Sequence, residues 1–286
     1  MSASVLERLR ARRDVVGAPL CLGIDPHPDR LPEGLSPDLS GLERFARGLV
    51  EAASGEAVAV KINVAFFEAF GAAGWATLER IRADVPGELV CIIDAKRGDI
   101  GSTAERYAEA IFGALDADAV TLSPYLGEDA IEPFLAHEAR LVYVLARTSN
   151  PSAARLQGLV SGDEPLYLHV ARWASERWRD GRVGLVVGAT APDELQRIRA
   201  AVPGPAFLVP GVGMQGGDID AAATCADGAW APGIVSVSRS IAEASRGADW
   251  REAARAAASA FRGRLADAVL HSTASPAHAA SSEVRN

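Results

Sequence analysis

Short apolar runs recur along the chain, and a segment with helical periodicity follows each of them. Eight of these runs predict β-strands, at residues 19–25, 57–63, 88–96, 119–125, 141–148, 183–190, 206–213 and 233–240. The runs are continuously apolar instead of alternating, which is typical of strands buried on both faces. Intervening segments such as 42–54 and 102–115 have the pattern of helices. The sequence therefore predicts parallel strands joined by crossover helices.

Eight strand–helix units in about 250 residues meet the requirement of a closed (β/α)8 barrel, or TIM barrel. A doubly wound open sheet is the alternative. It is disfavoured because no GxGxxG follows the first predicted strand, where a dinucleotide-binding sheet would carry it. We predict an α/β fold with one such barrel.

The two ends of the chain differ from the barrel repeats. The start, MSASVLERLRARRD, predicts an amphipathic helix; it has no apolar core of the kind a secretory signal needs. Residues 249–271 predict a closing helix. We expect one domain over residues 1–272 and a small, polar, disordered tail over 273–286. Residues 149–165 form the longest irregular connection and are a candidate lid.

Composition limits the possible functions. The chain has 286 residues, of which 49% are hydrophobic and 23% charged, so a packed core is expected and global disorder is excluded. Its net charge of −8 argues against nucleic-acid binding. No run approaches the ~18 apolar residues of a membrane span. Three cysteines without a CxxC motif favour a reduced, cytoplasmic protein. The five histidines show no ligand spacing, so no metal site is expected.

Candidate chemistry lies at the carboxyl ends of the predicted strands, where barrel enzymes place their active sites. The polar residues there are Asp25, Lys61, Asn63, Asp94, Lys96, Ser123, Thr148, Ser149, Gln215 and Arg239. Basic residues total 29, yet only Lys61 and Lys96 are lysines, and both fall at strand ends. Because residues two apart share a strand face, Asp94 and Lys96 are expected to point the same way.

These residues resemble the orotidine 5′-phosphate decarboxylase family over residues 19–245. The D-x-K-x-x-D-I signature of the family is present as Asp94, Lys96, Asp99 and Ile100. The lysine of the second strand is present as Lys61 in VKIN. A phosphate loop is present as PGVGMQGGD (210–218), and the arginine of the last strand as Arg239 in VSRSI. The segment RTSNPS is similar to the type 2 branch of the family.

The resemblance implies a cofactor-free decarboxylation of orotidine 5′-monophosphate to UMP and CO2 in de novo pyrimidine biosynthesis. It implies an alternating catalytic array of Lys61, Asp94, Lys96 and Asp99, with Asp99 supplied by the partner subunit of a homodimer with shared active sites. Loss of CO2 leaves an in-plane carbanion at C6 that the ring cannot delocalise. Lys96 is expected to stabilise this carbanion and then to donate the proton.

The resemblance also implies the substrate contacts. Asp25 is expected to accept a ribose hydroxyl, although it is also a suitable turn residue before Pro26. The pyrimidine-reading hydroxyl is Thr148 or Ser149, with Ser149 favoured. Thr103 is expected to act from the partner subunit or to serve only as a helix cap. The remaining expected contacts are Asn63, Ile100, Pro210, Gly213, Gln215, Gly216 and Arg239, of which Gln215, the glycines and Arg239 would hold the phosphate.

Two alternatives remain at this point. One is a magnesium-dependent phosphosugar decarboxylase or aldolase of the same barrel group, such as a keto-gulonate phosphate decarboxylase. That group holds its metal in part with an acidic residue at the end of the second strand, where this chain has Lys61 and Asn63. The other alternative is a non-catalytic barrel that binds phosphorylated ligands, which would need Gln215 and Arg239 but not both lysines.

Overall fold

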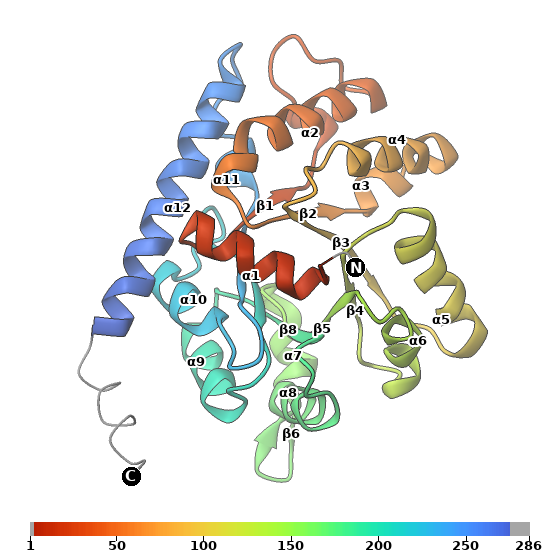
Figure 1. Cartoon of the computed structure of the whole chain (residues 1–286), viewed down its shortest axis with the longest axis vertical. Coiled ribbons are helices and arrows are strands. Elements are labelled where there is room, and N and C mark those ends of the chain that lie inside the picture. Colours follow the sequence, from red (N-terminus) through yellow and green to blue (C-terminus); the bar gives the residue numbers. More distant parts are fainter. Residues whose placement is uncertain (1–2, 275–286) are drawn as a thin grey trace.

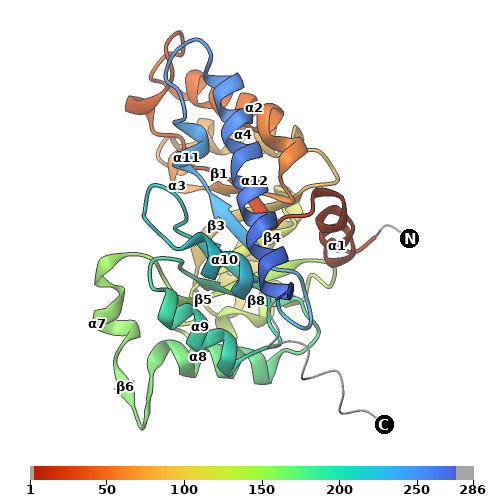
Figure 2. The ribbon, with the colours of Figure 1, turned by 90° about the vertical axis from the view of Figure 1, so that its left-hand side faces the viewer.

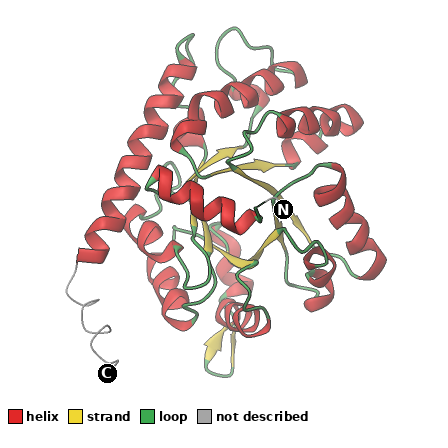
Figure 3. Ribbon diagram, viewed as in Figure 1, coloured by secondary structure: helices red, strands yellow, loops and turns green. Residues whose placement is uncertain are grey.

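A computed structural model describes residues 3–274 and contains a closed barrel of eight parallel strands (Figures 1 and 3). The barrel strands are β1 (Leu20–Ile24), β2 (Ala59–Asn63), β3 (Val90–Arg97), β4 (Ala119–Leu122), β5 (Leu141–Arg147), β8 (Val183–Val187), β9 (Phe207–Pro210) and β10 (Ile234–Val237). Their spatial order is β1-β10-β9-β8-β5-β4-β3-β2, which closes on itself. The predicted (β/α)8 barrel is confirmed, and the open-sheet alternative is wrong.

The helices form a ring around the barrel, except for α1, which crosses one end of it (Figure 3). They are α1 (Val5–Val16), α2 (Leu39–Ala53), α3 (Ala65–Glu68), α4 (Gly71–Ala83), α5 (Gly101–Ala108), α6 (Glu132–Leu135), α7 (Ala154–Gln157), α8 (Leu166–Arg177), α9 (Pro192–Ala201), α10 (Ile219–Ala226), α11 (Arg239–Ala242) and α12 (Trp250–Ala274). A π-helical segment, Glu109–Ala114, continues α5. Among residues 3–274, no helix is long and apolar enough to cross a membrane.

The amino-terminal helix α1 lies across the amino ends of the strands, opposite α7 (Figure 2). Ser4 and Glu7 form a capping box at its start, which explains why the helix begins there. Arg12 donates to the carbonyl oxygens of Ser54 (2.6 Å) and Ala57 (3.1 Å) just before β2. Arg8 pairs with Asp118, which precedes β4, at 2.5 Å. The predicted amino-terminal helix is therefore confirmed, and its arginines attach it to the amino end of the barrel, here called the barrel floor.

The floor carboxylate Asp118 is almost completely buried. It accepts the backbone N–H of Cys91 at 2.8 Å and also lies within ion-pair distance of Arg140 and Arg82. A buried carboxylate requires such partners, since burial of an unpaired charge is costly. The cluster ties α1 to β3 and β4.

Several local predictions need correction. Residues 149–165 are not irregular throughout: they contain a 3-10 turn (Pro151–Ala153), α7, and a hairpin of β6 (Val160–Ser161) and β7 (Glu164–Pro165). The closing helix α12 runs to Ala274, two residues into the predicted tail. The rest of that tail, 275–286, lies outside the described residues. Thr103 is no helix cap, because α5 begins at Gly101 with Ile100 at its N-cap and no side-chain bond there.

The core lies inside the barrel and between the barrel and its helices. Strand residues such as Leu22, Val60 and Ile92 have no exposed surface, which agrees with the continuous apolar runs of the sequence. The three cysteines are buried and free. The barrel interior is thus filled by side chains below the site, and polar groups concentrate at its carboxyl end.

Candidate active site

A cavity of about 700 Å³ opens at the carboxyl ends of the barrel strands. Ten of the predicted residues line it: Asp25, Lys61, Asn63, Asp94, Lys96, Thr148, Ser149, Pro210, Gln215 and Arg239. Five predicted site residues do not line it in this chain: Asp99, Ile100, Thr103, Gly213 and Gly216. Ser123, the polar strand-end residue expected on the fourth strand, is also absent from the lining.

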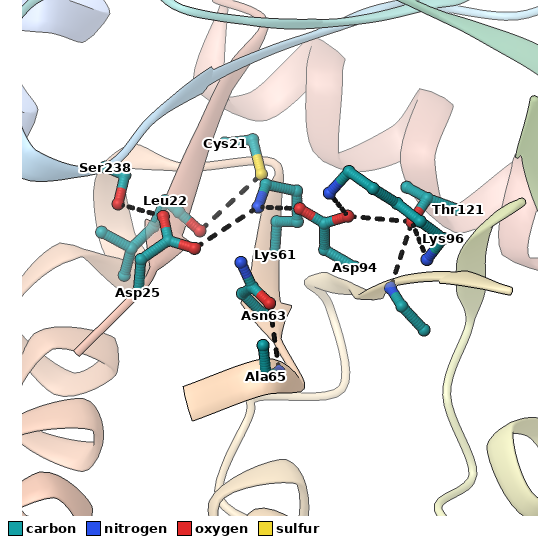
Figure 4. Close-up of polar contacts among 11 residues, drawn as sticks. Cys21, Leu22, Asp25, Lys61, Asn63, Ala65, Asp94, Lys96, Thr121 and Ser238 are labelled. Carbon is teal, nitrogen blue, oxygen red and sulfur yellow. Dashed lines mark hydrogen bonds and ion pairs between the residues drawn. The ribbon is translucent and has the colours of Figure 1, made fainter. Parts of the chain in front are cut away.

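The two lysines of the chain converge on one carboxylate at the centre of the site (Figure 4). Lys61 Nζ, from β2, donates to Asp94 Oδ2 at 2.8 Å, and Lys96 Nζ donates to Asp94 Oδ1 at 2.5 Å. Lys61 and Asp94 are buried, whereas the Lys96 side chain is 49% exposed. Lys96 therefore presents its ammonium to the cavity while Asp94 holds it.

The charges of the array stabilise one another. Burial alone would raise the pKa of the Asp94 carboxyl, but Lys61 and Lys96 outweigh it and hold that pKa well below its usual range. Burial would likewise lower the pKa of Lys61, but the carboxylates of Asp25 and Asp94 outweigh it and raise that pKa. Asp94 is therefore ionised and Lys61 protonated at neutral pH.

Asp25, at the end of the first strand, extends the array on the side of β10. Its Oδ1 lies 3.9 Å from Lys61 Nζ, and its Oδ2 accepts a hydrogen bond from Ser238 at 2.5 Å (Figure 4). Ser238 can come this close because residue 23 is glycine: a Cβ there would lie 2.7 Å from Ser238 Cβ. On β2, Asn63 accepts the N–H of Ala65 at 3.1 Å and lines the same cavity.

The loop after β9 has the glycine conformations that the sequence indicates. Gly211, Gly213 and Gly216 all have positive φ, which side chains with a Cβ rarely adopt. A Cβ on Gly213 would also lie 2.2 Å from the hydroxyl of Ser240. The loop brings Gln215 into the cavity lining, and it contacts α11 beside Arg239, because the Met214 N–H donates to the hydroxyl of Ser240 at 2.9 Å. The half-buried guanidinium of Arg239, the exposed amide of Gln215 and the glycine-rich backbone together suit an oxyanion such as phosphate.

At the end of β5, the two candidate hydroxyls differ in their partners. The Thr148 hydroxyl donates to Asn150 Oδ1 at 2.6 Å and accepts from Gln157 Nε2 at 2.8 Å. Gln157 Oε1 also accepts the Thr148 N–H at 2.9 Å, which fixes α7 to the strand end. Among residues 3–274, no hydrogen bond of the Ser149 hydroxyl is present. Ser149 thus keeps its hydroxyl available to a ligand.

Sequence reasoning missed several cavity residues. Thr121 lines the cavity and donates to Asp94 Oδ1 at 2.9 Å, two residues before the Ser123 that was expected. Its position within an apolar run gave no sign of this contact. Arg30, at the end of a 3-10 helix (Pro28–Arg30), and Gln157, at the end of α7, also reach the cavity, and the sequence does not specify where these short helices lie. Apolar residues form another part of its wall: Phe66, Leu145, Val186 and Leu208.

Fold and site together define a (β/α)8-barrel enzyme whose charged cavity lies at the carboxyl ends of its strands. A family model described as orotidine 5′-phosphate decarboxylase / HUMPS matches residues 18–257. The chain belongs to this family.

Relatives support the assignment. A protein named orotidine 5′-phosphate decarboxylase from Roseiflexus sp. (strain RS-1) is 48% identical over 254 residues, covering 88% of this chain and 93% of its own. The protein of that name from Roseiflexus castenholzii is 51% identical, and the match covers 85% of this chain and 90% of that protein. The solved structure of Leishmania donovani OMP decarboxylase has a TM-score of 0.78 at 38% identity, covering 92% of this chain and 99% of that one. The resemblance in the sequence motifs is confirmed.

Proposed function

We propose that this protein decarboxylates orotidine 5′-monophosphate to UMP and CO2 in pyrimidine biosynthesis. The observation that carries the proposal is the pairing of both lysines with the buried Asp94 at the edge of the cavity. A non-catalytic phosphate-binding barrel would have no need of this costly arrangement of buried charge. The family and the names of the relatives agree with the reaction.

In this reaction the bond between C6 and the carboxylate breaks, CO2 leaves, and the electron pair stays at C6. The Lys96 ammonium faces this carbanion and stabilises it electrostatically. The ammonium then transfers one proton to C6, which yields UMP and leaves a neutral amine that solvent reprotonates. No electron sink is required, so the reaction needs no cofactor.

Asp94 and Lys61 keep this ammonium in place. Asp94 accepts from Lys96 at 2.5 Å and so favours its charged form. Lys61 pairs with the other Asp94 oxygen and reduces the repulsion between that carboxylate and the substrate carboxylate. A second carboxylate near the leaving group is assigned to Asp99 of a partner subunit.

The substrate contacts follow from the cavity walls. Gln215 and Arg239, with the backbone of Gly213 and Gly216, bind the phosphate; Asp25 and Asn63 bind the ribose. Ser149, whose hydroxyl has no hydrogen bond among the described residues, reads the pyrimidine, and Pro210 forms another part of the cavity wall. Ile100 and Thr103 are assigned to the neighbouring active site.

We infer that the protein is a homodimer with shared active sites. Asp99 lies outside the cavity of its own chain, on the loop between β3 and α5. Exposed apolar side chains occur on this loop and on neighbouring segments: Ile100 (51% exposed), Tyr107 (37%), Tyr125 (79%) and Leu126 (46%). Exposed apolar groups of this kind are typical of protein interfaces, and a two-fold axis would bring each Asp99 to the other subunit.

Mixing two inactive variants tests the shared site. Lys96→Ala and Asp99→Ala are each expected to be inactive alone. After dissociation and reassociation, every heterodimer contains one site with both native residues, so about a quarter of wild-type activity should return. Absence of any recovery in a mixture shown to contain heterodimers would place Asp99 in its own chain's site.

The magnesium-dependent alternative is not supported by the site. The end of β2, where that group holds its metal, carries the buried, protonated Lys61. A fixed positive charge there repels a divalent cation. We further propose a cytoplasmic location, which suits three free, buried cysteines.

Turnover of orotidine 5′-monophosphate by the purified protein in excess chelator is the direct test. Conversion to UMP is expected at the same rate as without chelator. Lys96→Ala should lose at least about 10³-fold in kcat and still bind UMP. Arg172→Ala, which removes an exposed cation paired with Glu164 on the surface, serves as the control and should be fully active. Loss of turnover on chelation would favour the metal-dependent alternative.

A further inference from the structure

The pairing of β3 with β4 is interrupted at the catalytic residues. The regular pairs on either side are Ile93 with Val120 and Arg97 with Leu122. Three residues of β3, from Asp94 to Lys96, therefore lie opposite a single residue of β4, Thr121. Bulges of this kind leave backbone groups without ladder partners and redirect side chains.

The Thr121 hydroxyl replaces the missing ladder contacts. It accepts the backbone N–H of Ala95 at 3.1 Å and that of Lys96 at 3.0 Å. It donates its own proton to Asp94 Oδ1 at 2.9 Å. A hydroxyl has one proton and two lone pairs, so its bonding capacity is used completely. Thr121 is 1% exposed, so water cannot substitute for it without a rearrangement.

The bulge gives Lys96 an unusual backbone. Its φ is +45°, in the left-handed region that residues with a Cβ rarely adopt. Such a conformation persists only where the surroundings hold it. From this conformation Lys96 Nζ contacts Asp94 Oδ1, the same oxygen to which Thr121 donates. One hydroxyl therefore contacts both the backbone of the catalytic lysine and the carboxylate that holds its ammonium.

We propose that Thr121 is a positioning residue of the decarboxylation reaction. Its hydroxyl fixes the bulge, and the bulge fixes the Lys96 ammonium relative to C6 of the substrate. The inference rests on the proposed function, because it concerns the same reaction. It predicts that loss of the hydroxyl misplaces the ammonium while phosphate and base contacts remain intact.

Thr121→Val removes the hydroxyl and keeps the branched shape. Its kcat should fall by at least about tenfold, since a small displacement of a reacting group is costly. The affinity for UMP should stay within about threefold, because Gln215, Arg239 and Ser149 are untouched. A loss of kcat with unchanged UMP affinity separates positioning from general damage to the cavity.

A second pair of variants covers the case in which valine is not tolerated. Thr121→Ser and Thr121→Cys both lack the methyl group and differ only in the atom at the γ position. Serine retains a strong hydrogen-bonding hydroxyl, whereas the thiol is a weak donor and acceptor. The serine variant should keep most of the wild-type kcat, and the cysteine variant should lose it.

Thr77→Val is the matched control. Thr77 is also 1% exposed, and its hydroxyl bonds the carbonyl of Ala73 at 3.0 Å within α4, away from the cavity. This variant should show a loss of stability similar to that of Thr121→Val but a normal kcat.

Two outcomes would overturn the inference: wild-type kcat in Thr121→Val, or equal kcat in the serine and cysteine variants. An inactive wild-type protein would instead contradict the proposed function, so the two failures are distinguishable.

Discussion

Lys61 and Asp94, from neighbouring strands, form an ion pair of 2.8 Å in which both side chains are at least nine-tenths buried. The pair lies at the carboxyl end of the barrel, and its neighbours Asp25 and Lys96 are partly exposed, with 22% and 49% of their side-chain surface accessible. A buried pair of this kind is costly to break, because removal of one partner leaves the other charge in a poorly solvated place.

Lys61→Met tests this pair, since methionine has a similar length and no charge. The free energy of unfolding at pH 7 should fall toward the lower end of about 3–5 kcal/mol, because Lys96 still pairs with Asp94. Urea denaturation measures the change. Arg172→Met breaks an exposed pair with Glu164 and should cost about 0–1 kcal/mol. Equal effects in the two variants would contradict the importance of burial.

The stability difference between wild type and Lys61→Met should depend on pH at both extremes. The folded pKa of Asp94 is depressed, so its contribution is present above its unfolded pKa of about 3.9 and is lost as the pH falls through the folded value. The folded pKa of Lys61 is raised, so its contribution is complete below about pH 10.4 and is lost as the pH rises through the folded value. Urea titrations from pH 3 to pH 11 should show a plateau near neutrality and the beginning of a decline below about pH 4 and above about pH 10. A difference that is constant throughout would refute the assignment.

Arg239→Ala should affect binding of the substrate more than its chemistry. A charge-assisted hydrogen bond contributes about 1.5–3 kcal/mol, so KM should rise about 10- to 100-fold with a much smaller change in kcat. Steady-state kinetics measures both. Arg251→Ala removes another arginine, one that stacks on Trp250 at 4.2 Å, and should leave KM unchanged. A kcat defect alone would assign Arg239 to the reacting carbon instead of the phosphate.

The barrel floor offers a matched pair of aspartates. Asp118 is buried beneath α1, whereas the Asp116 side chain is 68% exposed and pairs with the same Arg82 and Arg140. Asp118→Asn should lower the free energy of unfolding by about 3–5 kcal/mol, and Asp116→Asn by less than about 1 kcal/mol. Neither should alter kcat, because both lie at the end of the barrel opposite the cavity. Thermal and urea unfolding measure the change in the free energy of unfolding. Kinetics on the folded fraction test whether kcat is unchanged.

Gly188→Ala should disturb recognition of the pyrimidine. A Cβ at residue 188 would lie 2.9 Å from the backbone N and 3.0 Å from the Cβ of Ser149. The methyl group must therefore displace Ser149, and kcat/KM should fall by about tenfold or more. Gly55→Ala is the control, because a Cβ there has no neighbour within 4 Å. If Gly188→Ala keeps the wild-type kcat/KM, the assignment of Ser149 to pyrimidine recognition is contradicted.

Much of the architecture is encoded in local patterns. Continuous apolar runs identified all eight barrel strands but not the β6–β7 hairpin. The polar residues at the strand ends identified most of the cavity, because parallel strands bring those ends together. Lys61 and Lys96 could be singled out because arginine fills nearly every other basic position. These features depend on composition and order along the chain, which the sequence states directly.

Other features depend on register, which the sequence does not state. Asp94 and Lys96 were expected to meet through simple strand alternation; they meet through a bulge in which Lys96 has positive φ. Thr121 could not be identified for the same reason, because its partners lie on a strand that has slipped relative to its own. The Thr190 hydroxyl donates to the carbonyl oxygen of Ser149 at 3.2 Å, a contact between two loops that the sequence does not indicate.

The contrast between the two lysines has a practical consequence. Lys61 is 7% exposed and Lys96 is 49% exposed, and the chain has no third lysine. Lys96 is therefore the one lysine side chain that an amine-reactive reagent can reach. Acylation requires the neutral amine, so labelling at alkaline pH, followed by mass spectrometry of the Lys96 peptide, would count the accessible sites, and protection by UMP would report their occupancy. The scarcity of lysine makes that one peptide a specific reporter of the active site of this enzyme.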